Sequence, residues 1–249
     1  MDTSRFALVA LYAGTVAAAE LPAGDCQQPA ARQDLSHCDF SGRDLSGLDL
    51  SGAHLDNVRL TGARLNGTRL DKVSAKWANF RGAQLQSAQL ADADLFHAIF
   101  DDADLSGANL QRANLFGANL VATRASKADF TGAFLKDLLM PEADLSGAIL
   151  RDCNALRAVL TDTALVGADL SDSNLTGADG ESADFTAATL HRTRLGGASL
   201  RAAIFRGADL TDADFSHATI TQGDFSGAKN LPQTVTDLLI APHLGVFAR

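Results

Sequence analysis

A strict five-residue period runs through most of the chain and constrains its fold more than any other feature. From Leu35 to Phe225, 35 of the 39 positions spaced five apart carry Leu, Phe, Met or Ile. The exceptions are Ala75, Ala125, Ala155 and Gly180. The residue two places before each position is Ala in 25 of the 39 cases. Because this register never slips, the segment must repeat one small structural unit.

Neither an α-helix nor a flat β strand has this period, since they repeat about every 3.6 and every 2 residues. In an extended segment, the large residue and the small one two places earlier face the same side, and the residue between them faces away. The other two residues, as in Ser46-Gly47, must turn a corner, where Gly is well tolerated. Each five-residue unit is then one side of a coil, and stacked coils share a continuous core.

Units such as Ala103-Asp104-Leu105 and Ala118-Asn119-Leu120 carry a consensus of Ala, then Asp or Asn, then Leu. In this pattern the chain resembles the pentapeptide repeat family over residues 35–227. The resemblance implies an all-β fold: a right-handed quadrilateral parallel β-helix, or solenoid, with twenty residues per coil and about ten coils. At a spacing of about 4.8 Å per coil, the rod is expected to be roughly 45 Å long.

Two stretches of the chain depart from the repeat and predict special ends. Arg5 is followed by an apolar run and by Ala17-Ala18-Ala19, which is typical of a secretory signal peptide. An ordinary apolar helix over the first coil is the alternative. After the repeat, the segment 233–240 predicts a short capping helix. The expected parts are a signal peptide at 1–19, an N-terminal cap segment at 20–34, the β-helix at 35–229 and a C-terminal cap with a short helix at 230–249.

The cysteines bear on the compartment and on the packing of the core. A signal peptide predicts a periplasmic or secreted protein, with a cytoplasmic one as the alternative. In an oxidising compartment, Cys26 and Cys38 could form a disulfide that pins the irregular N-terminal segment over the first coil. Two unpaired thiols remain the alternative. Cys153 falls at an inward position, where it acts as a small apolar residue.

Twenty-residue coils also predict which side chains stack in the core. Phe80 is expected to lie against Phe100, and Phe185, Phe205 and Phe225 to form one column. Two places are expected to be weak: Gly180, which leaves a core position empty, and the atypical stretch 138–141.

The surface charge disfavours one class of partner. The net charge of −9 gives no reason to expect direct nucleic-acid binding. Family members that protect DNA gyrase resemble duplex DNA in shape and charge, so a cytoplasmic DNA mimic that binds a type II topoisomerase is the alternative function. However, opposite charges alternate along one column of this chain, and the unbroken register leaves no room for projecting loops. The column reads Asp44, Arg64, Gln84, Asp104, Arg124 and Asp144.

Apolar residues at outward positions are the most unusual surface feature. On a square coil they gather in the middle of the rod on two neighbouring faces, which is typical of a contact surface. Scattered exposed apolar residues are also normal, and that interpretation stays open. The candidate interface residues are Phe96, Ile99, Phe116, Phe134, Leu139 and Val159.

The sequence lacks the short motifs of phosphate-binding loops, zinc proteases and serine hydrolases. We therefore expect no enzyme, cofactor, metal, small-molecule substrate or stable membrane span. The predicted function is a non-enzymatic, exported scaffold that binds an unknown protein partner, or itself as a homodimer, through the lateral apolar patch.

Overall fold

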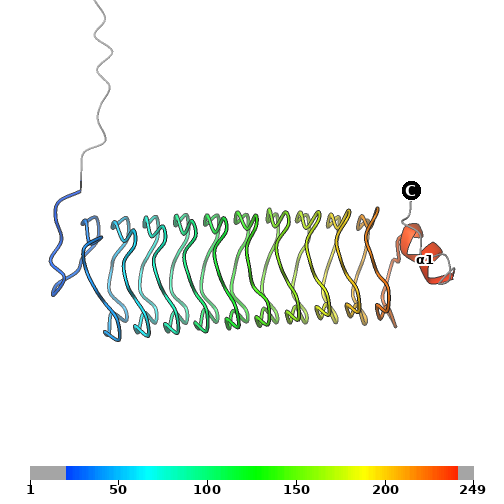
Figure 1. The fold of residues 1–249 in the computed structure, drawn as a ribbon, viewed down its shortest axis with the longest axis horizontal. Coiled ribbons are helices and arrows are strands. Elements are labelled where there is room, and N and C mark those ends of the chain that lie inside the picture. The colour runs from blue at the N-terminus through cyan, green and yellow to red at the C-terminus, as the bar shows by residue number, and fades with distance from the viewer. Residues whose placement is uncertain (1–20, 241–249) are drawn as a thin grey trace, which may run out of the picture.

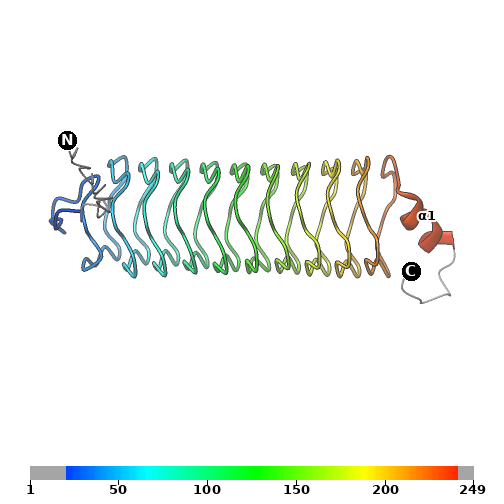
Figure 2. The ribbon, with the colours of Figure 1, turned by 90° about the horizontal axis from the view of Figure 1, so that it is seen from above.

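The chain forms a long, straight rod of stacked coils (Figures 1 and 2). The computed structural model describes residues 21–240, so the expected signal peptide at 1–19 lies outside the described residues. Parallel β-bridges join outward residues twenty positions apart, for example Asn79 with Ile99 and Ile99 with Asn119. The fold is a right-handed quadrilateral β-helix of about ten coils, as the resemblance implies. Each side contributes an isolated bridge to its neighbours instead of a long strand.

The backbone hydrogen bonds explain why five residues make one side. The Phe80 N–H donates to the carbonyl of Ile99 in the next coil at 2.7 Å, and the Gly82 N–H donates to that of Asp101 at 2.9 Å. The Ala83 N–H turns back to the Phe80 carbonyl at 2.9 Å and closes the corner. This pattern recurs along the rod, so bonds between coils connect all four sides.

The corners explain the Asp, Asn and Gly of the repeat. The first corner N–H donates to the carboxylate two residues earlier, as Ser46 does to Asp44 Oδ1 at 3.1 Å. The second corner residue has a left-handed backbone, with φ of 70° at Gly47. Residues other than Gly also adopt this conformation, including Trp77 with φ of 58°. Left-handed φ values disfavour bulky side chains, so Trp77 is unusual at such a position.

The core is filled by the large residues and by the small residues two places earlier. The expected aromatic columns are confirmed: ring centroids lie 4.6 Å apart for Phe80 and Phe100, and 4.8 Å apart for Phe205 and each of its column neighbours, Phe185 and Phe225. These rings are nearly parallel, with interplanar angles of 10° or less. The interior is therefore packed by stacking along the rod axis.

The two expected weak places are regular in the structure. A Cβ atom at Gly180 would lie 3.0 Å from Leu200 Cδ2. Leu200 therefore already occupies part of the space that we expected to be empty. In the stretch 138–141, Leu138 and Met140 are buried and Pro141 takes a corner position, so the register continues unchanged.

The inward threonine and cysteine side chains have hydrogen-bond partners. Thr123 Oγ1 donates to the Phe100 carbonyl at 2.7 Å, and Cys153 Sγ donates to the Phe130 carbonyl at 2.9 Å. Three other buried threonines bond in the same way to carbonyls 23 residues earlier; they are Thr68, Thr163 and Thr193. Threonine and cysteine therefore replace alanine at inward positions without leaving a buried hydroxyl or thiol unpaired.

Both ends of the β-helix are covered. At the first coil, Ala23 pairs with Asp34, and the regular corners begin at residues 31–32. At the other end, the only helix of the described residues, α1 (Gln233–Ile240), confirms the predicted helix (Figure 1). Val235 is fully buried against the last coil. The helix therefore covers strand edges that would otherwise be open. No helix in residues 21–240 is long and apolar enough to cross a membrane.

Candidate protein-interaction surface

Five aromatic side chains meet along one corner of the rod, and we call them the aromatic corner: Trp77, Phe96, His97, Phe116 and Phe134. Trp77 stacks on His97 with centroids 4.3 Å apart and an interplanar angle of 7°. Phe96 stacks on Phe116 at 5.4 Å, and Phe116 contacts Phe134 at 6.0 Å. The edge of Trp77 meets Phe96 at 5.7 Å and joins the two stacks. Three of the six candidate interface residues therefore lie in one continuous aromatic cluster.

The local backbone explains how this cluster reaches solvent. Trp77 and His97 are second corner residues in successive coils, and the Trp77 N–H bonds to the carbonyl of Phe96. In the next coil the same position is Gly117, where a Cβ atom would lie 2.5 Å from the His97 ring. The absence of a side chain at Gly117 therefore makes room for His97. Trp77 remains 54% exposed, more than any other large apolar residue of the described chain.

The other three candidates lie in a single column on the face that follows this corner. Successive bridges join Ile99, Asn119, Leu139 and Val159, which we call the aliphatic column. Leu139 is 40% exposed, whereas Ile99 and Val159 are half-buried. Because only two residues separate Phe96 from Ile99, the column and the aromatic corner adjoin. The structure thus brings all six candidates onto one corner and its two flanking faces.

Sequence reasoning left Trp77 and His97 out of the candidate surface. Their stack lies outside the core and continues the Phe96–Phe116 cluster. The signal was available in the sequence, because Trp77 and His97 occupy the corner position next to the column of Phe96 and Phe116.

Charged side chains adjoin the aromatic corner toward the C-terminus. Lys136 Nζ lies 5.7 Å from the centre of the Phe116 ring, which is a cation–π distance. Asp137, which follows Lys136, accepts two hydrogen bonds from Arg157 of the next coil at 2.8 and 2.7 Å. The N-terminal half of the corner is therefore aromatic, and its C-terminal half is charged.

Elsewhere, opposite charges pair between coils, as the alternating column predicts. Arg64 bonds to Asp44 at 2.7 Å, and Arg124 bonds to Asp104 at 3.0 Å. On another face, Asp39 accepts hydrogen bonds from Ser41 and from Arg59. These bonds, chiefly those from Ser41, lower the pKa of the Asp39 carboxyl to about 2. Much of the acidic surface is therefore neutralised by neighbouring arginines.

The cysteines occupy two distinct environments. The sulfur atoms of Cys26 and Cys38 lie at disulfide distance, with Cα atoms 5.5 Å apart. A nitrogen of the exposed His37 lies within 4.8 Å of both sulfurs, so a reduced form of this group could hold a metal ion. Burial raises the pKa of the Cys153 thiol to about 12, so this third cysteine stays protonated.

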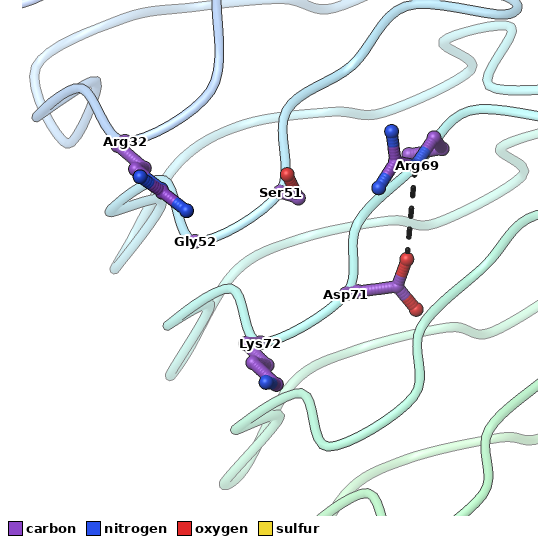
Figure 3. Close-up of a pocket in the computed structure, with 6 residues that line it drawn as sticks. All are labelled: Arg32, Ser51, Gly52, Arg69, Asp71 and Lys72. Atoms are coloured by element: carbon purple, nitrogen blue, oxygen red, sulfur yellow. Dashed lines mark ion pairs between the residues drawn. The ribbon is translucent and has the colours of Figure 1, made fainter.

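A shallow pocket near the N-terminal end is lined by Arg32, Ser51, Gly52, Arg69, Asp71 and Lys72 (Figure 3). Arg69 and Asp71 form a long ion pair of 4.0 Å across it. Arg32, Arg69 and Lys72 are exposed to solvent. Open charged side chains of this kind are typical of a solvated surface and differ from the mostly apolar walls of small-molecule sites.

Comparisons with known proteins agree with the repeat. Residues 33–110 match a pentapeptide repeat region, and 98–137, 142–177, 164–201 and 194–229 match pentapeptide repeats. No curated protein matches the chain significantly.

Solved structures of repeat proteins resemble the chain to different degrees. One of them is HetL, a pentapeptide repeat protein involved in heterocyst differentiation regulation in the cyanobacterium Nostoc sp. strain PCC 7120. It is 31% identical over 77% of this chain and 86% of its own, with a TM-score of 0.46. QnrB1, a plasmid-mediated fluoroquinolone resistance protein, is 18% identical over 85% of this chain and 97% of its own, with a TM-score of 0.48. A pentapeptide repeat protein of the Arabidopsis thaliana thylakoid lumen is 28% identical over 46% of this chain and 69% of its own, with a TM-score of 0.32.

Proposed function

The chain belongs to the pentapeptide repeat family, and from this premise we propose that it is a non-enzymatic, exported scaffold. It binds a protein partner, or a second copy of itself, through the side of the rod. The aromatic corner and the aliphatic column form the binding surface.

The observation that supports this proposal most is the gathering of exposed aromatic and aliphatic side chains at one place. Trp77 is 54% exposed, and Leu139 and Phe134 are 40% and 37% exposed. Contiguous apolar surface costs free energy in water and commonly marks a contact site. Aromatic residues, tryptophan above all, also contribute most to binding at protein interfaces.

Export is supported by the expected signal peptide and by the cysteines. Cys26 and Cys38 lie where a disulfide can form, and disulfides persist mainly in oxidising compartments. Mass spectrometry of the protein from its native host tests this part. We expect a mature N-terminus close to Glu20 and a mass lower than that of the reduced form by two hydrogen atoms. A protein that retains Met1 would contradict export.

A cytoplasmic DNA mimic remains the second candidate, but the surface charges favour it less. Arg64 and Arg124 pair with carboxylates of the preceding coil, which removes the continuous negative charge that a duplex presents. The match to QnrB1, at 18% identity, shows the fold alone.

Affinity capture from the native compartment tests the binding surface. We expect the wild-type rod to retain a protein, or another copy of itself, and the Phe116→Glu and Leu139→Glu variants to lose it. Ile149→Glu is the matched control, because Ile149 is 37% exposed in a column that joins Asp129 and Asp169. Equal capture by all four proteins would refute a binding role for this surface.

A further inference from the structure

We propose that the aromatic corner and the aliphatic column bind a second copy of this chain, and that the two rods lie antiparallel about a two-fold axis at Asn119. This proposal rests on the proposed function and names the partner of the same surface. Its basis is the order of side chains along three neighbouring columns. When a second rod runs in the opposite direction, the side chains of each column meet complementary side chains of the same column.

The rod geometry makes this comparison possible. The coils stay in line along the whole rod in both views (Figures 1 and 2), so each column is a nearly straight row with one residue per coil. A two-fold axis perpendicular to the rod and within the contact plane reverses the row but keeps each column opposite itself. A residue a given number of coils before the axis then faces the residue the same number of coils after it.

The aliphatic column is self-complementary about Asn119. One coil away on either side lie Ile99 and Leu139, so these apolar residues face each other in the dimer. Further out along the same ladder, Arg59 is three coils before the axis and Asp179 three coils after it. Arg59, which also bonds to Asp39 of its own rod, therefore faces an aspartate at both ends of the contact. Between these ends Ile99 meets Leu139, and Val159 meets Asn79.

The two columns of the corner repeat this complementarity. In one of them, Phe96 and Lys136 are one coil before and after Phe116, so a lysine faces a phenylalanine ring. In the other, Trp77 and Arg157 are two coils before and after Gly117, so a guanidinium faces the most exposed ring of the surface. Lysine and arginine both bind aromatic faces through cation–π attraction.

Other arrangements match less well. Shifting the axis by half a coil toward the C-terminus places Trp77 opposite Gly177 and His97 opposite Arg157, and Arg59 then faces Ser199. Parallel rods related by an axis along their length would place the aromatic corner opposite the corner on the other side of the face, away from Lys136 and Arg157. Of these three arrangements, only the antiparallel one at Asn119 places Arg59 opposite Asp179 and Trp77 opposite Arg157.

Contact over these coils extends about 29 Å along the rod, at about 4.8 Å per coil. This is a small interface, so we expect a weak, reversible homodimer. Sedimentation equilibrium of the full-length wild-type protein should show dimers that dissociate on dilution. A wild-type protein that remains monomeric up to about 1 mM would overturn the proposal.

Charge reversal with complementation tests the register. Arg59→Asp and Asp179→Arg should each weaken the homodimer at least about tenfold, because like charges then meet at both ends. Mixing the two variants should restore dimers, since every Asp then faces an Arg in the mixed pair. Asp49→Arg is a control outside these columns and should leave dimerisation unchanged. Failure of the mixture to recover would overturn the antiparallel register.

Cysteine substitutions test the axis directly. Asn119→Cys should be joined between the two rods by a short bismaleimide crosslinker, because the two copies of position 119 meet at the axis, while packed sheet faces lie about 10 Å apart, too far for a direct disulfide. Ser199→Cys lies four coils away in the same column and should remain uncrosslinked, since it faces Asp39 of the other rod. Crosslinking of both variants would indicate parallel rods and overturn the arrangement proposed here.

The same experiments separate this inference from the proposed function. If the wild-type rod is monomeric but captures another protein in a Phe116-dependent manner, the proposed function stands and the homodimer is refuted. If it neither dimerises nor captures a protein, both are refuted.

Discussion

Two aromatic stacks, one inside the rod and one outside it, are built by the same twenty-residue repeat. The inner stack of Phe185, Phe205 and Phe225 has centroid spacings of 4.8 Å, and the outer pair of Phe96 and Phe116 has a spacing of 5.4 Å. The coil height therefore sets the stacking in both places. The position within the five-residue unit decides whether a ring faces the core or solvent, and so whether it contributes to folding or is available for binding.

Truncating one ring of each stack should separate these two roles most strongly. Phe205→Ala leaves a cavity between two stacked rings, so we expect the free energy of unfolding to fall by about 3–5 kcal/mol. Phe116→Ala, the matched change at the half-buried outer stack, should cost less than about 1 kcal/mol. Chemical denaturation of both variants measures the difference. Equal losses would contradict the assignment of the two stacks to different roles.

A smaller effect is expected from the hydroxyl groups inside the rod. Thr123→Val keeps the side-chain shape but removes the hydrogen bond to the Phe100 carbonyl, so we expect a loss of about 1 kcal/mol in unfolding free energy. Thr131→Val is the control at a corner, where the hydroxyl bonds to Asp129 in partial contact with solvent. If Thr123→Val lowers the unfolding free energy no more than Thr131→Val does, the inner hydrogen bonds contribute little to stability.

The hydrogen bonds and ion pairs of surface aspartates should contribute least to the stability of the fold in acid. Hydrogen bonds from serine and arginine lower the pKa values of the Asp39 and Asp224 carboxyls to about 2. A lowered pKa in the folded state stabilises the protein above the unfolded value of about 3.9, and this stabilisation is lost as the pH falls toward 2. Thermal midpoints should therefore be constant from about pH 7 to 5 and fall by a few degrees between about pH 4 and 2. A midpoint that rises in this range would contradict the sign.

Buried sulfur provides a chemical test of the same contrast between inside and outside. Because the Cys153 thiol is buried and its pKa is raised to about 12, we expect no alkylation by iodoacetamide at about pH 8 in the native protein. Denaturation should expose it at once. Rapid labelling of native protein at Cys153, identified by peptide mass spectrometry, would show that the coils open there.

Much of the fold could be predicted because a large apolar residue at every fifth position is compatible with few structures. The core columns and the charge pairs followed directly from counting in twenties, as Phe80 with Phe100 and Arg64 with Asp44 show. The surroundings of Gly180 could not be predicted in this way, because counting residues cannot show how closely Leu200 approaches that position.

The candidate surface was predicted in part for a similar reason. Outward positions identified Leu139 and the first corner residues Phe96 and Phe116, but second corner residues were harder to assign. A corner side chain can fold back on the rod or project from it, and its direction depends on the neighbours in adjacent coils. Trp77 stacks on His97, which in turn lies over Gly117, and this three-coil arrangement turns the indole into a surface feature.

The twenty-residue coil also limits how such a chain can change its length. Removing five residues would advance every later side chain by a quarter turn, so that Trp77 and Arg157 would come to lie on different corners. Removing twenty would shorten the rod by one coil and leave all later residues on their original faces. Insertions and deletions are therefore compatible with a lateral binding surface only when they comprise whole coils, and the distance between two groups on one face can vary only in steps of about 4.8 Å.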